Sequence, residues 1–95
     1  MAVTTRTLER VDYLLEYLES SLSDLEENGT LWAQLTEEQK DDFLQEWPIV
    51  EDKIADLQRL VDGYPMPADR RRRYTRLRER VATDRLLLED LRERA

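Results

Sequence analysis

The sequence contains no cysteine and no histidine. Without cysteine, the chain can form no disulfide bond, no thiolate nucleophile and no cysteine-ligated metal site. Without histidine, it lacks the commonest general base, the imidazole ligands of zinc sites and the Glu-x-x-His pattern of di-iron helical bundles. Only carboxylate chemistry remains, so we expect no metal, no cofactor and no enzymatic activity.

Glycine and proline are also scarce, at two and three residues in 95. Because hydrophobic and charged residues occur in nearly equal shares, 40% and 39%, this composition favours long amphipathic helices over a sheet. No apolar run approaches the roughly 18 residues of a membrane span, and Met1–Thr7 lacks the hydrophobic segment of a signal peptide. We therefore expect a single soluble, cytoplasmic, all-α domain with no membrane contact.

The clearest periodic pattern lies in the middle of the chain. Apolar residues alternate at spacings of four and three, as in a heptad repeat, at Phe43, Trp47, Val50, Ile54, Leu57 and Val61. The pattern keeps its phase across Pro48, which predicts one helix bent at this proline rather than two helices joined by a loop. Thr36 and Gln39 have the spacing of a capping box, so this helix is predicted over residues 37–62.

Similar patterns predict a helix on each side. The first covers residues 5–28 and ends at Gly29, and its apolar positions are Leu8, Val11, Leu15, Leu18, Leu22 and Leu25. The third covers residues 68–94, after the helix-breaking residues 63–67, and its pattern is Tyr74, Leu77, Val81, Asp84, Leu88 and Leu91. A short helical turn at about residues 31–35 is expected to fold Trp32 and Leu35 over one end.

Helices of similar length with short connections predict an antiparallel, up-down-up three-helix bundle with coiled-coil-like seams. The alternative is a long helical hairpin whose exposed seam is covered by a second chain. Asp84 is a charged residue at a seam position. It would lie at the edge of the seam, pair with Arg80 or a cation on another helix, or face a partner.

Charge is distributed unevenly. Residues 1–29 carry a net charge of −5 and residues 30–63 one of −6, whereas residues 64–95 carry +4. The third helix is therefore expected to pair with the other two, through Glu9, Asp12, Glu16, Asp52, Asp56 and Asp62. The alternative is that nucleic acid or another polyanion binds its arginines, which are Arg70, Arg71, Arg72, Arg73, Arg76, Arg78 and Arg80. The net charge of −7 disfavours this alternative.

An acidic cluster is expected at the opposite end of the bundle, where Glu26 and Glu27 would meet residues 37–42. The run Glu37-Glu38-x-x-Asp41-Asp42 resembles the Glu-Glu-x-x-Glu element with which all-helical nucleotide pyrophosphohydrolases hold magnesium. That resemblance implies a carboxylate-dependent magnesium hydrolase as a further alternative. The third helix carries no second element of this kind, because Glu89-Asp90-x-x-Glu93 has a different spacing.

Four residues remain outside the seams as candidates for contact with a partner: Tyr13, Leu14, Tyr17 and Leu86. Tyrosine is favoured at contacts that are apolar on one side and wet on the other. The alternative for the residues of the first helix is that the third helix covers them. We interpret the chain as a non-catalytic helical interaction module, an adaptor, scaffold or regulatory subunit, that binds a protein partner or forms a homodimer.

Overall fold

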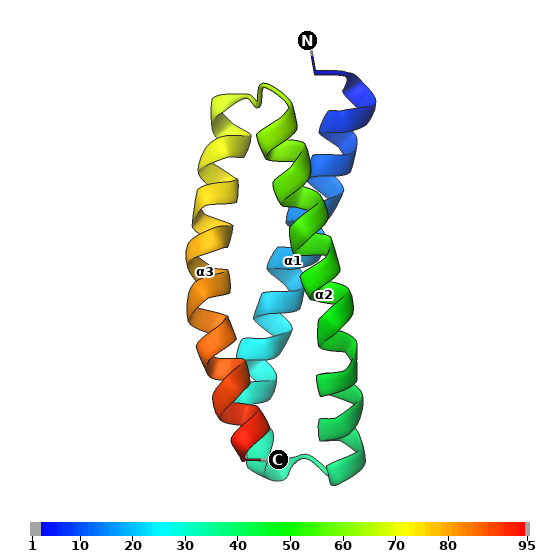
Figure 1. Cartoon of the computed structure of the whole chain (residues 1–95). Helices are drawn as coiled ribbons and strands as arrows, with labels where there is room; N and C mark the ends of the chain where they lie inside the picture. Colours follow the sequence, from blue (N-terminus) through cyan, green and yellow to red (C-terminus); the bar gives the residue numbers. More distant parts are fainter. Residues whose placement is uncertain (1–2, 95) are drawn as a thin grey trace.

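In the computed structural model, which describes residues 3–94, the chain forms three long helices and one short 3-10 helix, without a strand among those residues. The elements are α1 (Thr5–Thr30), η1 (Trp32–Gln34), α2 (Glu37–Gly63) and α3 (Ala68–Glu93). As Figure 1 shows, α1 and α3 run in the same direction and α2 runs in the opposite one, with α1 packed behind and between the other two. The predicted all-α, up-down-up three-helix bundle is therefore confirmed.

Side-chain caps begin the first two helices. Thr4 Oγ1 accepts a hydrogen bond of 3.1 Å from the backbone N–H of Thr7 at the start of α1. At the start of α2, the Gln39 N–H donates to Thr36 Oγ1 at 3.1 Å, and the Thr36 N–H donates to Gln39 Oε1 at 2.9 Å. The predicted capping box is thus present, and a cap of this kind contributes about 1 kcal/mol to stability.

Gly29 does not end α1, contrary to the sequence-based expectation. No glycine among the described residues has a positive φ, and α1 continues to Thr30. A Cβ atom on Gly29 would lie 3.4 Å from Leu87 Cδ2 of α3. This distance is an ordinary van der Waals contact, so Gly29 is a helical residue beside α3 that neither ends the helix nor is needed for the packing.

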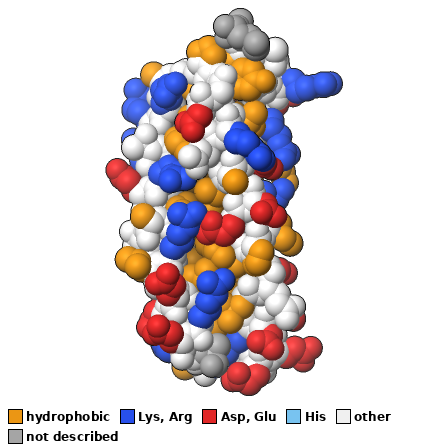
Figure 2. All heavy atoms as spheres, in the orientation of Figure 1, with side chains coloured by type: hydrophobic (Ala, Val, Ile, Leu, Met, Phe, Trp, Pro, Cys, Tyr) orange, Lys and Arg blue, Asp and Glu red, His pale blue; other side chains and the backbone are white. Residues whose placement is uncertain are grey.

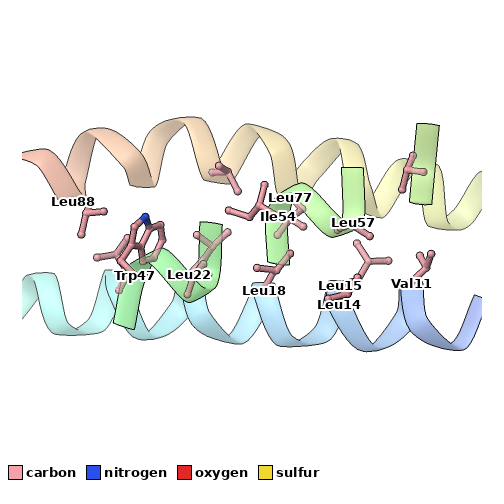
Figure 3. Packing of buried hydrophobic residues seen from close by; sticks show 14 of the residues in the cluster. Val11, Leu14, Leu15, Leu18, Leu22, Trp47, Ile54, Leu57, Leu77 and Leu88 are labelled. Carbon is pink, nitrogen blue, oxygen red and sulfur yellow. The ribbon is translucent and has the colours of Figure 1, made fainter. Parts of the chain in front are cut away.

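The predicted seams form the hydrophobic core (Figure 3). The indole of Trp47 lies between α1 and α3, close to Leu22 and Leu88, and α2 passes through Pro48 without a break. Trp32 of η1 is also buried and Leu35 packs against the core, which confirms the predicted closing turn. The buried seam residues are Val11, Leu15, Leu18, Leu22, Leu25, Trp47, Val50, Ile54, Leu57, Val61, Leu77, Val81, Asp84, Leu88 and Leu91.

The helix α1 is the central element of the bundle. It packs closely against both α2 and α3, whereas α2 and α3 approach each other at few backbone positions. Long side chains bridge the α2–α3 face, which Figure 2 shows with apolar side chains visible between charged ones. Arg85 of α3 binds Glu51 of α2 through two hydrogen bonds of 3.0 and 2.7 Å, and this pairing lowers the pKa of Glu51.

None of these helices combines the length and the apolar character that crossing a membrane requires, over the part of the chain that the structure describes.

Candidate functional site

An open groove of about 760 Å³ runs between α1 and α2. Both walls are helical, so the side chains that line it have fixed spacings along each wall. We call it the α1–α2 groove, and its lining residues are Tyr13, Glu16, Tyr17, Ser20, Ser21 and Asp24 from α1, with Phe43, Glu46, Trp47, Ile49 and Val50 from α2.

The lining of the groove contains large apolar side chains at several depths. Trp47 and Val50 are buried in the core, Tyr17 and Phe43 are half-buried, and Ile49 is 52% exposed. The Trp47 Nε1–H donates a hydrogen bond of 3.1 Å to Glu51 Oε1, which fixes the orientation of the indole. The groove therefore offers a preformed apolar surface, as binding sites commonly do.

Two tyrosines form one end of the groove, and a lysine outside its lining packs over their rings. The rings of Tyr13 and Tyr17 lie 6.1 Å apart, and Lys53 Nζ of α2 lies 5.7 Å from the first centroid and 4.9 Å from the second. The guanidinium of Arg10 lies 5.4 Å from the Tyr13 centroid. These are cation–π contacts. They show that a cation from α2 packs over the tyrosines, rather than the third helix that the alternative interpretation placed there.

The charged side chains that line the groove are all acidic. Glu16 and Asp24 on α1 and Glu46 on α2 are exposed, and the lining includes no lysine or arginine. The nearest cation described above is Lys53, at the tyrosine end. A ligand in the groove would therefore meet an apolar surface bordered by negative charge.

The structure brings two of the four candidate partner residues together. Tyr13 and Tyr17 line the groove, with Tyr13 48% exposed. Leu14 is fully buried, so its assignment to a partner surface is corrected: α1 has two neighbouring helices, and Leu14 packs in the core between them. Leu86 is 68% exposed on α3 but does not line the groove.

Sequence reasoning does not identify the α2 wall. The seam residues of this wall are expected to be buried in the core, yet three of them also line the groove: Phe43, Trp47 and Val50. Ile49 is the informative residue, because it is a large apolar side chain that lies outside the heptad pattern, immediately before Val50. An aliphatic residue off the seam is a signal for exposed apolar surface.

Three of the seven clustered arginines make ion pairs with α1. Arg70 binds Asp12 through two hydrogen bonds of 2.8 Å, and this contact lowers the pKa of Asp12 and raises that of Arg70. The other two pairs are Arg73 Nε with Glu19 Oε2 at 3.0 Å and Arg80 Nη2 with Glu26 Oε1 at 2.7 Å.

The predicted intramolecular pairing is thus confirmed for these arginines, although Glu19 and Glu26 were not among the predicted partners. A fourth arginine, Arg78, donates a hydrogen bond of 3.2 Å to Gln58 of α2. Arg71, Arg72 and Arg76 are exposed and make no ion pair within residues 3–94. Four of the seven arginines, these three and Arg78, therefore make no ion pair within the described residues and keep their charge for a polyanion.

Asp84 is buried, with only 4% of its surface exposed. Its Oδ2 atom has no hydrogen-bond partner among the described residues, and the side chain adjoins a second cavity, of about 700 Å³, between α1 and α3. The pKa of Asp84 is raised to about 6, mainly by loss of solvation and also by the nearby Glu26 carboxylate, while Arg80 opposes the change. The expected position at the edge of the seam is wrong, and no direct pair with Arg80 forms.

The acidic run at the start of α2 is exposed to solvent. Lys40 Nζ lies 3.4 Å from Glu37 Oε1 and also 5.9 Å from the centroid of Trp32. Within residues 3–94, no three acidic side chains converge closely enough to hold a metal ion. Figure 2 shows that basic side chains predominate toward the α2–α3 turn and acidic ones toward the opposite end.

The α1–α2 groove is therefore the best candidate for a binding site, because it combines exposed aromatic and aliphatic side chains with charge of one sign. No known protein family matches the chain, and comparison with characterised proteins and with solved structures also found no match.

Proposed function

We propose that the protein is a non-catalytic helical interaction module, an adaptor, scaffold or regulatory subunit, which binds a partner chain in the α1–α2 groove. The observation that supports this proposal is the pair of half-exposed side chains on opposite walls, Tyr13 at 48% and Ile49 at 52% exposure. Trp47 and Phe43 lie in the same groove. Because the seams already form the core, the exposed parts of these side chains do not contribute to packing within the bundle.

The energetics favour a protein ligand. Full burial of one large aliphatic side chain contributes about 1.5–3 kcal/mol, and Ile49 has about half of that still to gain. Tyrosine is enriched among the residues that dominate protein interfaces, and two tyrosines with accessible surface line the groove, Tyr13 and Tyr17. The groove is open along its length, which suits an extended macromolecular surface better than an enclosed small molecule.

The test is co-purification with matched variants. Tagged wild-type protein, Ile49→Glu and Leu86→Glu would be isolated from the native cells, and each associated protein would be quantified by mass spectrometry. Both substitutions add one charge at an exposed aliphatic residue, but only Ile49 lines the groove. We expect Ile49→Glu to lose the partner by about tenfold or more and Leu86→Glu to retain it. Retention of the partner by Ile49→Glu would contradict the proposal.

A further inference from the structure

We infer that the partner of the α1–α2 groove is a basic amphipathic helix of about three turns, which lies between α1 and α2 as a fourth helix. This inference rests on the proposed function and specifies the chemistry of the ligand. It follows from the shape of the groove, from the sign of its charge and from the mismatch between the groove and the exposed surfaces of this chain itself.

The form of the walls favours a helix. The α1 wall extends from Tyr13 to Asp24, about 17 Å or three turns at 1.5 Å per residue, and the α2 wall from Phe43 to Val50, about 10 Å or two turns, so the longer wall sets the upper length of the ligand. The structure has no strand within residues 3–94, so an extended peptide has no sheet edge on which to add. Two adjacent helices instead offer the groove in which an amphipathic helix buries its apolar face.

The charge of the groove selects a basic ligand. Glu16 and Asp24 are separated by about two turns on one wall, and Glu46 lies on the other. Lysines or arginines that border the apolar stripe of a ligand helix would face these carboxylates on both sides. The net charge of −7 for the whole chain would also speed the approach of a basic partner.

A second copy of this chain fits the groove poorly. The exposed leucine of α3, Leu86, shares its helix face with Glu89 and Asp90, three and four residues further on. Docking of that face would bring carboxylates against the carboxylates of the groove. Apposition of two grooves would do the same. In both arrangements, which are the ones that bring apolar surface of a second copy to the groove, the repulsion of like charges favours a different chain as the occupant.

The experiment uses the full chain and three synthetic peptides of about 14 residues. One carries a leucine stripe at helical spacing bordered by lysines, the second replaces every lysine by glutamate, and the third has the lysine peptide's composition in scrambled order. Binding would be measured by isothermal titration calorimetry at low and at high salt. We expect the lysine-bordered peptide to bind at least about tenfold more tightly than either of the others, with an affinity that falls as salt rises.

Two variants with equal charge changes locate the effect. The groove variant is Glu16→Gln with Asp24→Asn and Glu46→Gln, and the control variant is Glu37→Gln with Glu38→Gln and Asp41→Asn, at the exposed start of α2. We expect the groove variant to weaken binding by about tenfold and the control variant to change it less than about twofold.

Several outcomes would overturn the inference. These are no binding of any peptide, equal binding of the scrambled peptide, equal weakening by both variants, or a concentration-dependent dimer that Ile49→Glu abolishes. The failure of the proposed function is distinguishable. If the native partner is lost from Ile49→Glu but kept by the groove variant, the groove binds a partner that is not a basic helix. If Ile49→Glu keeps the partner, the groove is not the binding site.

Discussion

The two long interfaces of α1 differ in how they end at the surface. Toward α3, ion pairs cover the edge of the core at Asp12, Glu19 and Glu26, and Leu87 packs directly against Gly29. Toward α2, the edge opens into the α1–α2 groove, and the closest ion pair across it, Arg10 with Asp56, has a distance of 3.9 Å. The same helix therefore has one edge closed by charged pairs and one edge left open.

This difference separates residues that are expected to affect stability from residues that are expected to affect binding. Apart from the buried Asp84, the α1–α3 interface pairs its apolar and charged groups within the chain, so its residues are expected to affect stability. The α1–α2 interface leaves aromatic and aliphatic surface uncovered, so its outer residues are expected to affect binding with little effect on stability. Four measurements test this distinction.

The largest expected effect contrasts two aliphatic residues, Leu88 and Ile49. Leu88→Ala should reduce the free energy of unfolding by about 2–5 kcal/mol, because Leu88 is 2% exposed and its removal leaves a cavity. Ile49→Ala should change it by less than about 0.5 kcal/mol, because Ile49 is already half in water. Urea denaturation followed by circular dichroism measures both values. Equal losses would show that Ile49 belongs to the packed core.

The second effect concerns a weak point in the closed interface, the ionised carboxylate of Asp84. Its pKa is raised from 3.8 in the unfolded chain to about 6 in the folded one, so folding favours the protonated form. Stability is therefore lost as pH rises from about 4 to about 6, by up to about 3 kcal/mol. Asp84→Asn should be more stable than wild type by about 1–3 kcal/mol above pH 6 or so, and this difference should shrink toward pH 4.

The measurement for Asp84 is the unfolding free energy of both proteins as a function of pH. A difference between variant and wild type that does not change with pH would mean that the ionised carboxylate is not the destabilising group. At each pH, the unfolding free energy of wild type must be subtracted from that of the variant. Carboxylates with lowered pKa values, such as Asp12 and Glu51, lose their stabilising contribution in acid in both proteins, and the subtraction removes this shared effect.

The third effect tests how closely α3 approaches α1. Gly29→Ala should stabilise the protein by about 0.5–1 kcal/mol, because alanine has the higher helix propensity and Gly29 has no positive φ. The new Cβ would be in ordinary van der Waals contact with Leu87, at 3.4 Å. Gly63→Ala, with open space around it at the end of α2, is the control. A loss of stability in Gly29→Ala alone would show that the two helices pack too closely for any side chain.

The smallest effect concerns the ion pair between Asp12 and Arg70. A double-mutant cycle with Asp12→Asn and Arg70→Gln should give a coupling of about 0.2–1 kcal/mol, since both side chains remain partly in water, and added salt should reduce it. Because the pKa of Asp12 is lowered on folding, its contribution is present above about pH 4 and is lost as pH falls below that value. No coupling at low salt would mean that the pair does not help to close this interface.

Heptad spacing predicts the core well because burial in a long-helix bundle depends mostly on helical phase. This explains why the phase across Pro48 identifies one helix and why even Asp84 lies where the seam places it. The end of α1 is less well predicted, because Gly29 adopts a helical backbone and α1 continues past it to Thr30. A residue type alone cannot distinguish a glycine that ends a helix from one that lies within it.

The groove is predicted only in part because it depends on the arrangement of helices in space. Tyr13 and Leu14 are adjacent in sequence and both apolar, yet the first lines the groove and the second is fully buried between neighbouring helices. The acidic ion-pair partners on α1 could be predicted from the sequence, because Asp12, Glu19 and Glu26 recur at intervals of seven residues. Acids at heptad spacing beside a seam indicate an edge where a basic helix packs.

The positions of the two lysines of the sequence, Lys40 and Lys53, have a practical consequence. Each lies over aromatic rings, Lys53 at the tyrosine end of the groove and Lys40 over Trp32 at the closing turn. Acylation of Lys53 by an amine-directed reagent would be slowed by an occupant of the groove, while Lys40 would provide an internal reference. Cellular acetylation of Lys53 would remove the positive charge above both tyrosines and make the groove more acidic still.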